Sequence, residues 1–224
     1  MNPIAKRTIS ALTTAALVVL AIIYAPTKWI TPAFLVIYLA VIAEFMALMA
    51  KKYGKWDFRG ILPSIFGILL IGGCLGALPT IAEEHGNLMM LYVIAIIKIS
   101  DMGGFAAGVS TAKLMKGGNH KMCPTISPNK SWEGLAGSVA ASCILSCCFI
   151  PITNFAWYKA LAFGVTAALV GTFGDLVESK FKRWVGVKDS STMKFTNGMG
   201  GILDMLDSLL FAPAAILLVR LLAA

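Results

Sequence analysis

About seven long apolar segments follow one another along this chain, and their lengths constrain its fold more than any other feature. They lie at roughly residues 9–25, 29–50, 60–79, 88–110, 132–152, 155–177 and 201–222. The hydrocarbon core of a membrane is about 30 Å thick, and a helix needs about 20 apolar residues to cross it. With 58% hydrophobic and 13% charged residues, the chain is too apolar for an ordinary soluble protein. We therefore predict an all-α fold, a polytopic membrane helical bundle of about seven transmembrane helices.

Little of the chain remains between these segments, so we expect a single integral-membrane domain over residues 1–224. Lys6 and Arg7 precede the first apolar segment, as they would in a secretory signal peptide. No small-residue cleavage site stands out after that segment, and further apolar segments follow it. We expect it to be retained as the first span.

Basic residues gather on one side of the predicted bundle. The loops of that side carry most of the 19 Lys and Arg residues: Lys6, Arg7, Lys51, Lys52, Lys55, Arg59, Lys113, Lys116, Lys121, Lys130, Lys180, Lys182, Arg183, Lys188 and Lys194. Because cytoplasmic loops are enriched in Lys and Arg, we predict a cytoplasmic N-terminus and an external C-terminus. This asymmetry explains most of the net charge of +8, so we expect no nucleic-acid partner. A basic cytoplasmic surface favours anionic lipid headgroups and nucleotides.

Three predicted helices bring carboxylates to a similar depth near the cytoplasmic side. Asp101 lies about 20 Å along the fourth segment, Asp175 ends the sixth, and Asp204 and Asp207 lie in the first turns of the seventh. A charge inside the membrane costs about 2.5 to 3.5 kcal/mol, so this convergence favours a function. Mg²⁺ binds carboxylates together with waters and phosphate oxygens. We therefore predict that Asp175, Asp204 and Asp207 bind Mg²⁺, and we leave a second metal ion open.

Helical spacing adds polar residues to this group. Glu178, Ser179 and Lys182 share a face with Asp175 if that helix continues past the membrane. The plainer interpretation is that Asp175 and Asp204 only form ion pairs with Lys182 or Arg183 at the membrane surface.

A glycine-rich turn precedes the seventh segment. Gly198, Gly200 and Gly201 stand just before Asp204. Glycines let backbone N–H groups approach a ligand closely, and a helix N-terminus favours anions. By itself this pattern is common, but beside two carboxylates it is typical of a phosphate-binding turn.

The end of the fourth segment and the loop after it carry further candidates. Glycines and alanines that follow Asp101 allow close packing of helices, and Lys98 is placed to neutralise the aspartate. The loop then reads Ser-Pro-Asn-Lys-Ser-Trp-Glu-Gly over residues 127–134, which is more specific than an interfacial Trp requires. Asp101, Ser127, Lys130 and Trp132 are therefore the candidates of this region for a functional role.

Taken together, these residues resemble the bacterial CDP-diacylglycerol synthases, also called phosphatidate cytidylyltransferases. The signature of that family matches Ser179, Lys182-Arg183, Lys188-Asp189, the turn Gly198 to Gly201 and Asp204-x-x-Asp207, and its upstream motifs match Asp101, Gly103, Ser127, Pro128, Lys130, Trp132 and Gly134. Asn197 and Met199 stand where the family usually has Pro and His. The resemblance begins near residue 60, and the signature-bearing catalytic part covers about residues 88–224.

The resemblance implies a Mg²⁺-dependent nucleotidyltransferase of phospholipid biosynthesis that converts CTP and phosphatidic acid into CDP-diacylglycerol and pyrophosphate. The expected catalytic residues are Asp175, Ser179, Lys182, Arg183, Lys188, Asp204 and Asp207. The residues expected to bind substrate are Asp101, Ser127, Lys130, Trp132, Gly200 and Gly201. It further implies a protein of the bacterial cytoplasmic (inner) membrane whose active site faces the cytoplasm, and it leaves a homodimer open.

Other functions remain open at this point. A cytidylyltransferase or a CTP-dependent kinase acting on another membrane lipid would use the same groups. A transporter would also place charges in a bundle, although usually near the middle of the membrane. An inactive homologue that only binds lipid is the last alternative. The Asp-Gly-x-x-Ala-Arg pattern of CDP-alcohol phosphotransferases is absent.

Overall fold

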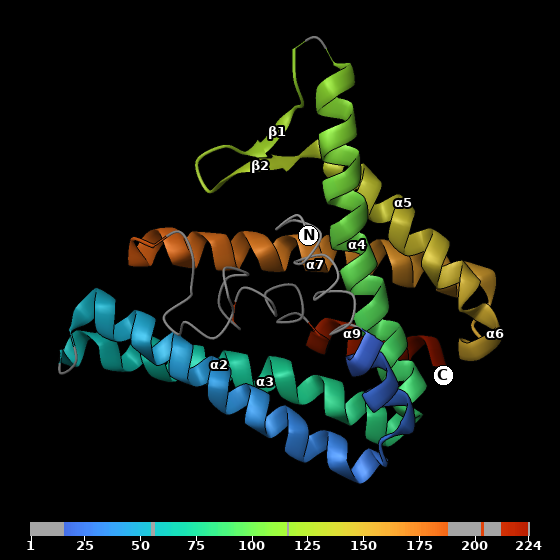
Figure 1. The fold of residues 1–224 in the computed structure, drawn as a ribbon, viewed down its shortest axis with the longest axis horizontal. Coiled ribbons are helices and arrows are strands. Elements are labelled where there is room, and N and C mark those ends of the chain that lie inside the picture. The colour runs from blue at the N-terminus through green and yellow to red at the C-terminus, as the bar shows by residue number, and fades with distance from the viewer. Residues whose placement is uncertain (1–15, 55–56, 116, 188–202, 204–211, 224) are drawn as a thin grey trace, which may run out of the picture.

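A computed structural model describes residues 16–54, 57–115, 117–187, 203 and 212–223 of this chain (Figure 1). Residues 16–24 are helical. The further helices are α2 (Ile30–Tyr53), α3 (Ile61–His85), α4 (Asn87–Leu114), α5 (Trp132–Cys148), α6 (Ile150–Thr153), α7 (Trp157–Val185) and α9 (Ala212–Ala223), with the 3₁₀ turns η1 (Thr27–Trp29) and η2 (Phe58–Gly60). Two short strands, β1 (Lys121–Cys123) and β2 (Ser127–Ser131), complete the described elements.

Four helical segments in the described part of the chain are long and apolar enough to cross a membrane. They are Thr27–Tyr53, Phe58–His85, Asn87–Leu114 and Trp157–Val185. They confirm the helices predicted near 29–50, 60–79, 88–110 and 155–177. The segment predicted at 132–152 forms the shorter apolar helix α5 and the single turn α6. The total of seven transmembrane helices and the cytoplasmic position of the N-terminus stay predictions.

The all-α prediction omitted a small hairpin. Strands β1 and β2 pair antiparallel, with Lys121 opposite Ser131 and Cys123 opposite Ser127. In Figure 1 the hairpin lies beside the end of α4, before the chain enters α5. The sequence motif of residues 127–134 therefore lies on a strand and the first turn of a helix rather than in an open loop.

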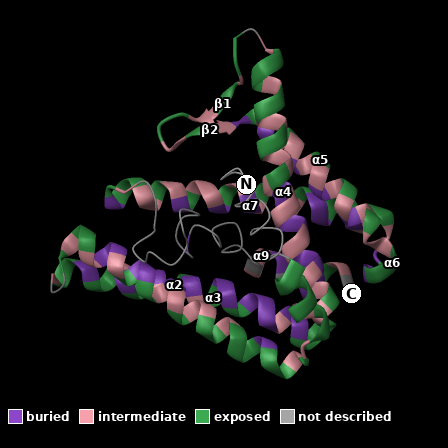
Figure 2. Ribbon diagram, in the orientation of Figure 1, coloured by how far each residue is buried: buried purple, intermediate pink, exposed green. Residues whose placement is uncertain are grey.

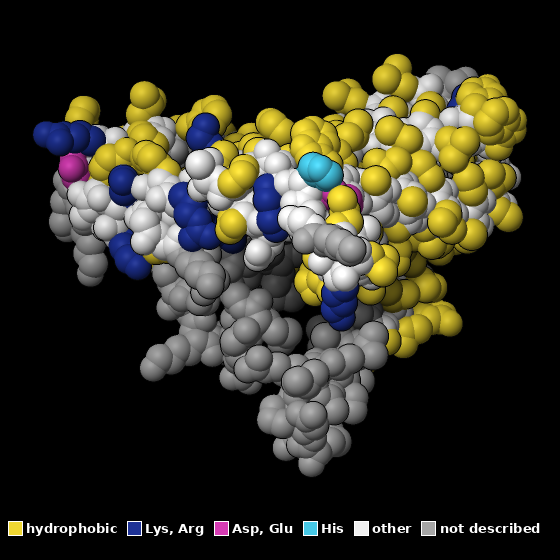
Figure 3. Space-filling view, turned by 90° about the horizontal axis from the view of Figure 1, so that it is seen from above, with side chains coloured by type: hydrophobic (Ala, Val, Ile, Leu, Met, Phe, Trp, Pro, Cys, Tyr) yellow, Lys and Arg dark blue, Asp and Glu magenta, His cyan; other side chains and the backbone are white. Residues whose placement is uncertain are grey.

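The helices form two packed groups, which Figure 1 shows from one side and Figure 2 by burial. In one group α2 and α3 lie side by side, and their buried residues, among them Val41, Leu48 and Leu75, form a cluster with Val185 of α7. In the other, α4 and α7 pack on the second half of α3 and on α9 around Tyr92. On the face seen in Figure 3 the Lys and Arg side chains lie mainly on the left and in the centre, and hydrophobic side chains predominate on the right.

Glycines hold α4 and α5 close together. A Cβ at Gly137 would overlap the Cβ of Ala107 and lie 2.8 Å from the carbonyl oxygen of Gly103. A Cβ at Gly103 would in turn lie 2.8 Å from the carbonyl oxygen of Gly137 and overlap the Cβ of Ala141. Small residues let helix backbones approach this closely in membranes. The packing confirms the role predicted for the glycines after Asp101.

Hydroxyl groups on α5 then fix α7. The Ser142 Oγ donates to the carbonyl oxygen of Gly164 at 2.9 Å, and the Ser146 Oγ donates to that of Ala160 at 2.7 Å. Both serines are fully buried. The Ser142 Oγ also lies 2.7 Å from the Ser138 carbonyl oxygen of its own helix, so the contacts to α7 support the register between α5 and α7 without defining it alone. Helices α4, α5 and α7 are therefore held together as one unit around the site.

Candidate active site

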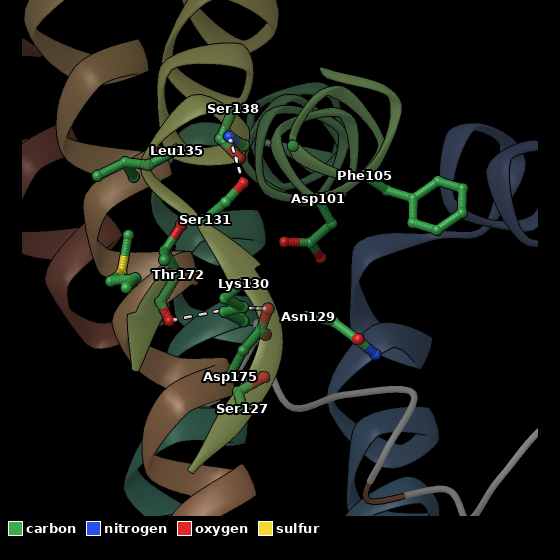
Figure 4. A pocket seen from close by; sticks show the side chains of 13 residues that line it. Asp101, Phe105, Ser127, Asn129, Lys130, Ser131, Leu135, Ser138, Thr172 and Asp175 are labelled. Carbon is green, nitrogen blue, oxygen red and sulfur yellow. Dashed lines mark hydrogen bonds and ion pairs between the residues drawn. The ribbon is translucent and has the colours of Figure 1, made fainter. Parts of the chain in front are cut away.

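A cavity of about 260 Å³ opens where α4, the hairpin, α5 and α7 meet. Four residues predicted from the sequence line it, namely Asp101, Ser127, Lys130 and Asp175. Figure 4 shows that they come from three elements: Asp101 from α4, Ser127 and Lys130 from β2, and Asp175 from α7. The structure thus brings together side chains that lie far apart in the sequence.

An ion pair joins the hairpin to α7 inside this cavity. The Lys130 Nζ lies 2.5 Å from the Asp175 Oδ2 and also donates to the carbonyl oxygen of Thr172 at 3.4 Å. About a fifth of each side chain is exposed, 22% for the lysine and 21% for the aspartate. In the described part of the chain the partner of Asp175 is therefore Lys130. An ion pair of Asp175, which the plainer interpretation expected, is thus present, and the partner that the structure gives is the lysine of the hairpin.

The second oxygen of Asp175 is available to a ligand. Its Oδ1 is buried and has no hydrogen-bond partner among the described residues. Buried carboxylate oxygens are normally hydrogen-bonded, and an exception calls for an explanation. A hard divalent cation that prefers oxygen ligands, such as Mg²⁺, fits this atom. The described residues alone form no group of three side chains able to hold a metal.

Asp101 faces the same cavity from the opposite side. Figure 4 shows its carboxylate directed into the pocket, and Phe105, one turn further along α4, also lines the cavity. Lys98 lies 3.9 Å from the Asp101 Oδ2, which confirms the neighbour that the sequence indicated. The cavity therefore holds two carboxylates and a lysine, an arrangement suited to a phosphate ligand together with a cation.

Further predicted site residues lie in the last turns of α7, and they do not line the cavity. Helix α7 does continue to Val185, as the shared face of Asp175 and Lys182 required. The Lys182 Nζ pairs with the Oε2 of the buried Glu178 at 2.7 Å. Ser179 is half-buried, and the exposed Arg183 donates from Nη1 to the carbonyl oxygen of Val187 at 3.4 Å. Ser179 and Lys182 lie about one and two turns beyond Asp175.

Trp132 does not line the cavity. It is the first residue of α5 and its side chain is 58% exposed. Its neighbour Ser131 caps this helix, since the Ser131 Oγ accepts from the Gly134 N–H at 3.1 Å. The exposed indole agrees with an interfacial position, which was the alternative for this residue.

Polar contacts attach the hairpin to the helices. The Asn119 Nδ2 donates to the carbonyl oxygen of Gly108 in α4 at 2.6 Å. The His120 Nδ1 lies 2.6 Å from the Glu133 Oε1, and the His120 backbone N–H donates to the same oxygen. Hydrogen bonding by His120 lowers the pKa of Glu133 to about 2. These contacts fix the strand that presents Lys130.

The remaining predicted site residues lie outside the described part of the chain. They are Lys188, Gly200, Gly201, Asp204 and Asp207. Their assignments stay predictions.

Sequence analysis missed several polar residues of this region. Asn129, Ser138 and Thr172 also line the cavity. Asn129 lies within the quoted string of residues 127–134 but was not predicted as a site residue, and no motif contains Ser138 or Thr172. Sequence analysis also missed Glu44 of α2, which is 1% exposed and whose Oε2 accepts from the Leu203 N–H at 2.9 Å. An isolated carboxylate within a long apolar segment is itself a signal of function, and it could have identified Glu44.

Comparison with known proteins finds a family and several curated relatives. Residues 2–222 match the Cytidylyltransferase family. A phosphatidate cytidylyltransferase of Mycobacterium bovis is 40% identical over 144 residues, which are 63% of this chain and 43% of the relative. A phosphatidate cytidylyltransferase of Staphylococcus aureus is 40% identical over 131 residues, 58% of this chain and 47% of the relative. The chain thus spans less than half of the length of these curated relatives. Because the family match covers nearly all of its residues, the chain belongs to the Cytidylyltransferase family.

Proposed function

We propose that this protein is a Mg²⁺-dependent phosphatidate cytidylyltransferase of phospholipid biosynthesis. It would convert CTP and phosphatidic acid into CDP-diacylglycerol and pyrophosphate. The observation that carries the proposal is the cavity in which Asp101, Lys130 and Asp175 meet, with one buried oxygen of Asp175 free of hydrogen bonds to the described residues. The names of the similar proteins supply the nucleotide and the lipid.

The reaction needs little acid–base chemistry. A phosphate oxygen of phosphatidic acid attacks the α-phosphorus of CTP, a new P–O bond forms, and the bond from the α-phosphorus to the oxygen that bridges to the β-phosphate breaks. The leaving group is pyrophosphate. Because the attacking phosphate is already an anion, no strong base is required. The protein's task is to overcome the repulsion between anions and to align them.

Acidic and basic residues would contribute to this task in different ways. Asp175, together with Asp204 and Asp207, would hold Mg²⁺, which when bound neutralises phosphate charge. Lys130 is placed to meet a phosphate at the same carboxylate, and Asp101 and Ser127 also line the cavity.

The other signature residues extend the site along α7 and beyond. In this proposal Lys182, Arg183 and Lys188 neutralise the phosphates of CTP and the departing pyrophosphate. Ser179, Gly200 and Gly201 orient phosphate oxygens. Trp132 sits at the membrane surface beside the lipid substrate.

An interfacial site suits the two substrates. Phosphatidic acid is anchored by acyl chains whereas CTP is dissolved in water, so they meet only at the membrane surface. The four membrane-crossing helices support an integral membrane protein. The excess of basic residues in alternate loops supports a bacterial cytoplasmic membrane location with the site facing the cytoplasm.

An assay with purified protein in detergent tests the proposal directly. The protein is incubated with Mg²⁺, α-labelled CTP and phosphatidic acid, and both label in the lipid phase and pyrophosphate are measured. We expect equal amounts of both, and none when EDTA replaces Mg²⁺. Asp175→Asn in correctly folded protein should reduce turnover by at least about 10²- to 10³-fold. If label were transferred only to a different lipid phosphate, the proposal that phosphatidic acid is the substrate would be wrong. If label were transferred to no lipid, the proposed cytidylyltransferase activity would be wrong.

A further inference from the structure

A second cavity, of about 280 Å³, lies between α2 and α3, which Figure 1 shows side by side. Its lining includes the apolar side chains of Phe34, Leu35, Leu75 and Pro79, together with the acidic residue Glu83. No described residue lines both this cavity and that of the candidate active site. Its volume is close to the lower bound of about 300 Å³ for ligand pockets in proteins. The proposed mechanism uses none of these residues.

This cavity, which we call the α2–α3 groove, extends along both helices. The α3 residues that line it run from Gly72 to Glu83, which is about 16 Å of helix. Those of α2 run from Thr31 to Tyr38. Both helices belong to segments that are long and apolar enough to cross a membrane. Because the hydrocarbon core is about 30 Å thick, the groove is about as deep as one leaflet of the bilayer.

Two glycines shape the groove. A Cβ at Gly76 would meet no other atom within 4 Å, so the space above this residue is open. At Gly72 the Tyr38 side chain fills the space instead, since a Cβ there would lie 2.8 Å from the Tyr38 Oη. The Tyr38 hydroxyl donates to the carbonyl oxygen of Ile68 at 3.3 Å. Tyr38 therefore forms the deep end of the groove, which stays open beside Gly76.

The other end of the groove carries a negative charge. The Thr31 Oγ1 donates to the Glu83 Oε1 at 2.6 Å, and Glu83 forms no ion pair with any other described residue. Its neighbour Glu84, by contrast, is paired with Arg220 of α9. Helix α3 ends at His85, and the C-terminus of a helix carries partial negative charge of its own. This end of the groove therefore favours a cation.

An apolar groove of one leaflet's depth with an anionic end matches an amphiphile that has a cationic headgroup. We propose that the α2–α3 groove binds a phospholipid whose headgroup carries a primary amine. One acyl chain lies in the open space beside Gly76, and the ammonium group donates hydrogen bonds to Glu83. A lipid whose headgroup is only anionic is repelled at this end. The site is separate from the candidate active site, and this inference does not rest on the proposed function.

The test measures lipid binding to purified protein in detergent by native mass spectrometry. The two probes are dioleoyl phosphatidylethanolamine and dioleoyl phosphatidylglycerol, which differ only in the headgroup. Glu83→Gln removes the charge, and Gly76→Leu fills the groove at a position where a side chain meets no neighbouring atom. Glu84→Gln and Gly73→Leu are the matched controls, because neither residue lines the groove and a Cβ at Gly73 also meets nothing within 4 Å. Thermal unfolding of each variant checks its fold.

We expect the wild-type protein to bind the ethanolamine lipid about tenfold more tightly than the glycerol lipid, an effect typical of a hydrogen bond to a charged group. Glu83→Gln should bind both lipids with the same affinity, and Gly76→Leu should also lose the preference. Both controls should keep it. The inference would be overturned by a wild-type protein without a preference, or by an unchanged preference in Glu83→Gln or in Gly76→Leu.

The same spectra distinguish another occupant of the groove. Dimers that Gly76→Leu dissociates, in a wild-type protein without a lipid preference, would identify a second copy of the chain as the occupant and would also overturn the inference. Because the measurement uses no CTP, phosphatidic acid or Mg²⁺, its outcome is independent of the proposed cytidylyltransferase activity. An active protein without the lipid preference would remove only this inference.

Discussion

The Lys130 Nζ and the Asp175 Oδ2 lie 2.5 Å apart, although 45 positions separate the two residues in the chain. The pair connects a short hairpin to the longest described helix, α7. It also places a cation beside the carboxylate that we propose as a metal ligand. The same lysine is therefore placed both to orient Asp175 and to meet a substrate phosphate.

Replacing Lys130 by Met should impair the reaction much more than the fold. The side chain is only partly buried, so its aliphatic part can be replaced by Met, whereas the charge near the phosphates is lost. We expect kcat to fall by about 10²-fold, the usual effect of removing one group that stabilises developing charge. Lys113→Met removes an exposed cation at the end of α4 and serves as the control. Equal activity of both variants in the labelled CTP assay would contradict the role of Lys130.

A second prediction concerns the close packing of α4 on α5. An added methyl group in Gly137→Ala would overlap Ala107 and approach the Gly103 carbonyl oxygen, so the two helices must separate. We expect a loss of about 1 to 3 kcal/mol in the free energy of unfolding, as for other overpacked positions. A Cβ at Gly73 of α3 meets nothing within 4 Å, so Gly73→Ala is the matched control. Unfolding in detergent measures both, and an equally stable Gly137→Ala protein would show that the helices adapt without cost.

A third prediction concerns the contact between His120 and Glu133 and its effect on how thermal stability depends on pH. The pKa of Glu133 falls from its usual 4.5 to about 2 because His120 donates hydrogen bonds to the ionised carboxylate. A lowered pKa means that the contact stabilises the fold fully above pH 4.5 and loses this effect as the pH falls toward 2. We expect wild-type protein to lose thermal stability relative to Glu133→Gln over this range. Parallel curves for the two proteins would contradict the contact.

The sequence predicted the main helices because their signal is local. Apolar runs of sufficient length dictate helices in a membrane, and α2, α3, α4 and α7 appear within a few residues of the expected bounds, except that α7 continues to Val185. That extension follows from charged residues such as Lys180 and Lys182, which end the apolar run without ending the helix. Hydropathy marks where the membrane ends, and a helix is free to continue beyond it.

Other parts of the site depend on contacts between residues far apart in the sequence, which a local sequence pattern cannot indicate. The sequence identified Lys130 and Asp175 as separate candidates, but their pairing depends on how the hairpin folds over α7. The hairpin was expected as a loop, because three- and five-residue strands are too short for a recognisable alternation. Glu44 stands out in the sequence as a lone carboxylate within an apolar segment, but no sequence pattern reveals that its partner is the backbone N–H of Leu203.

The proposed orientation of the helices can be tested with single cysteines. Cys123 lies in the hairpin, on the side that the basic loops place in the cytoplasm, whereas the exposed His85 precedes the turn between α3 and α4 on the other side. We expect a membrane-impermeant maleimide to label His85→Cys, but not Cys123, in right-side-out membrane vesicles, with the other cysteines replaced by Ser. Opening the vesicles with detergent should expose Cys123 and serves as the control. Labelling of Cys123 alone in sealed vesicles would reverse the orientation, and the cavity would then face away from the CTP of the cytoplasm.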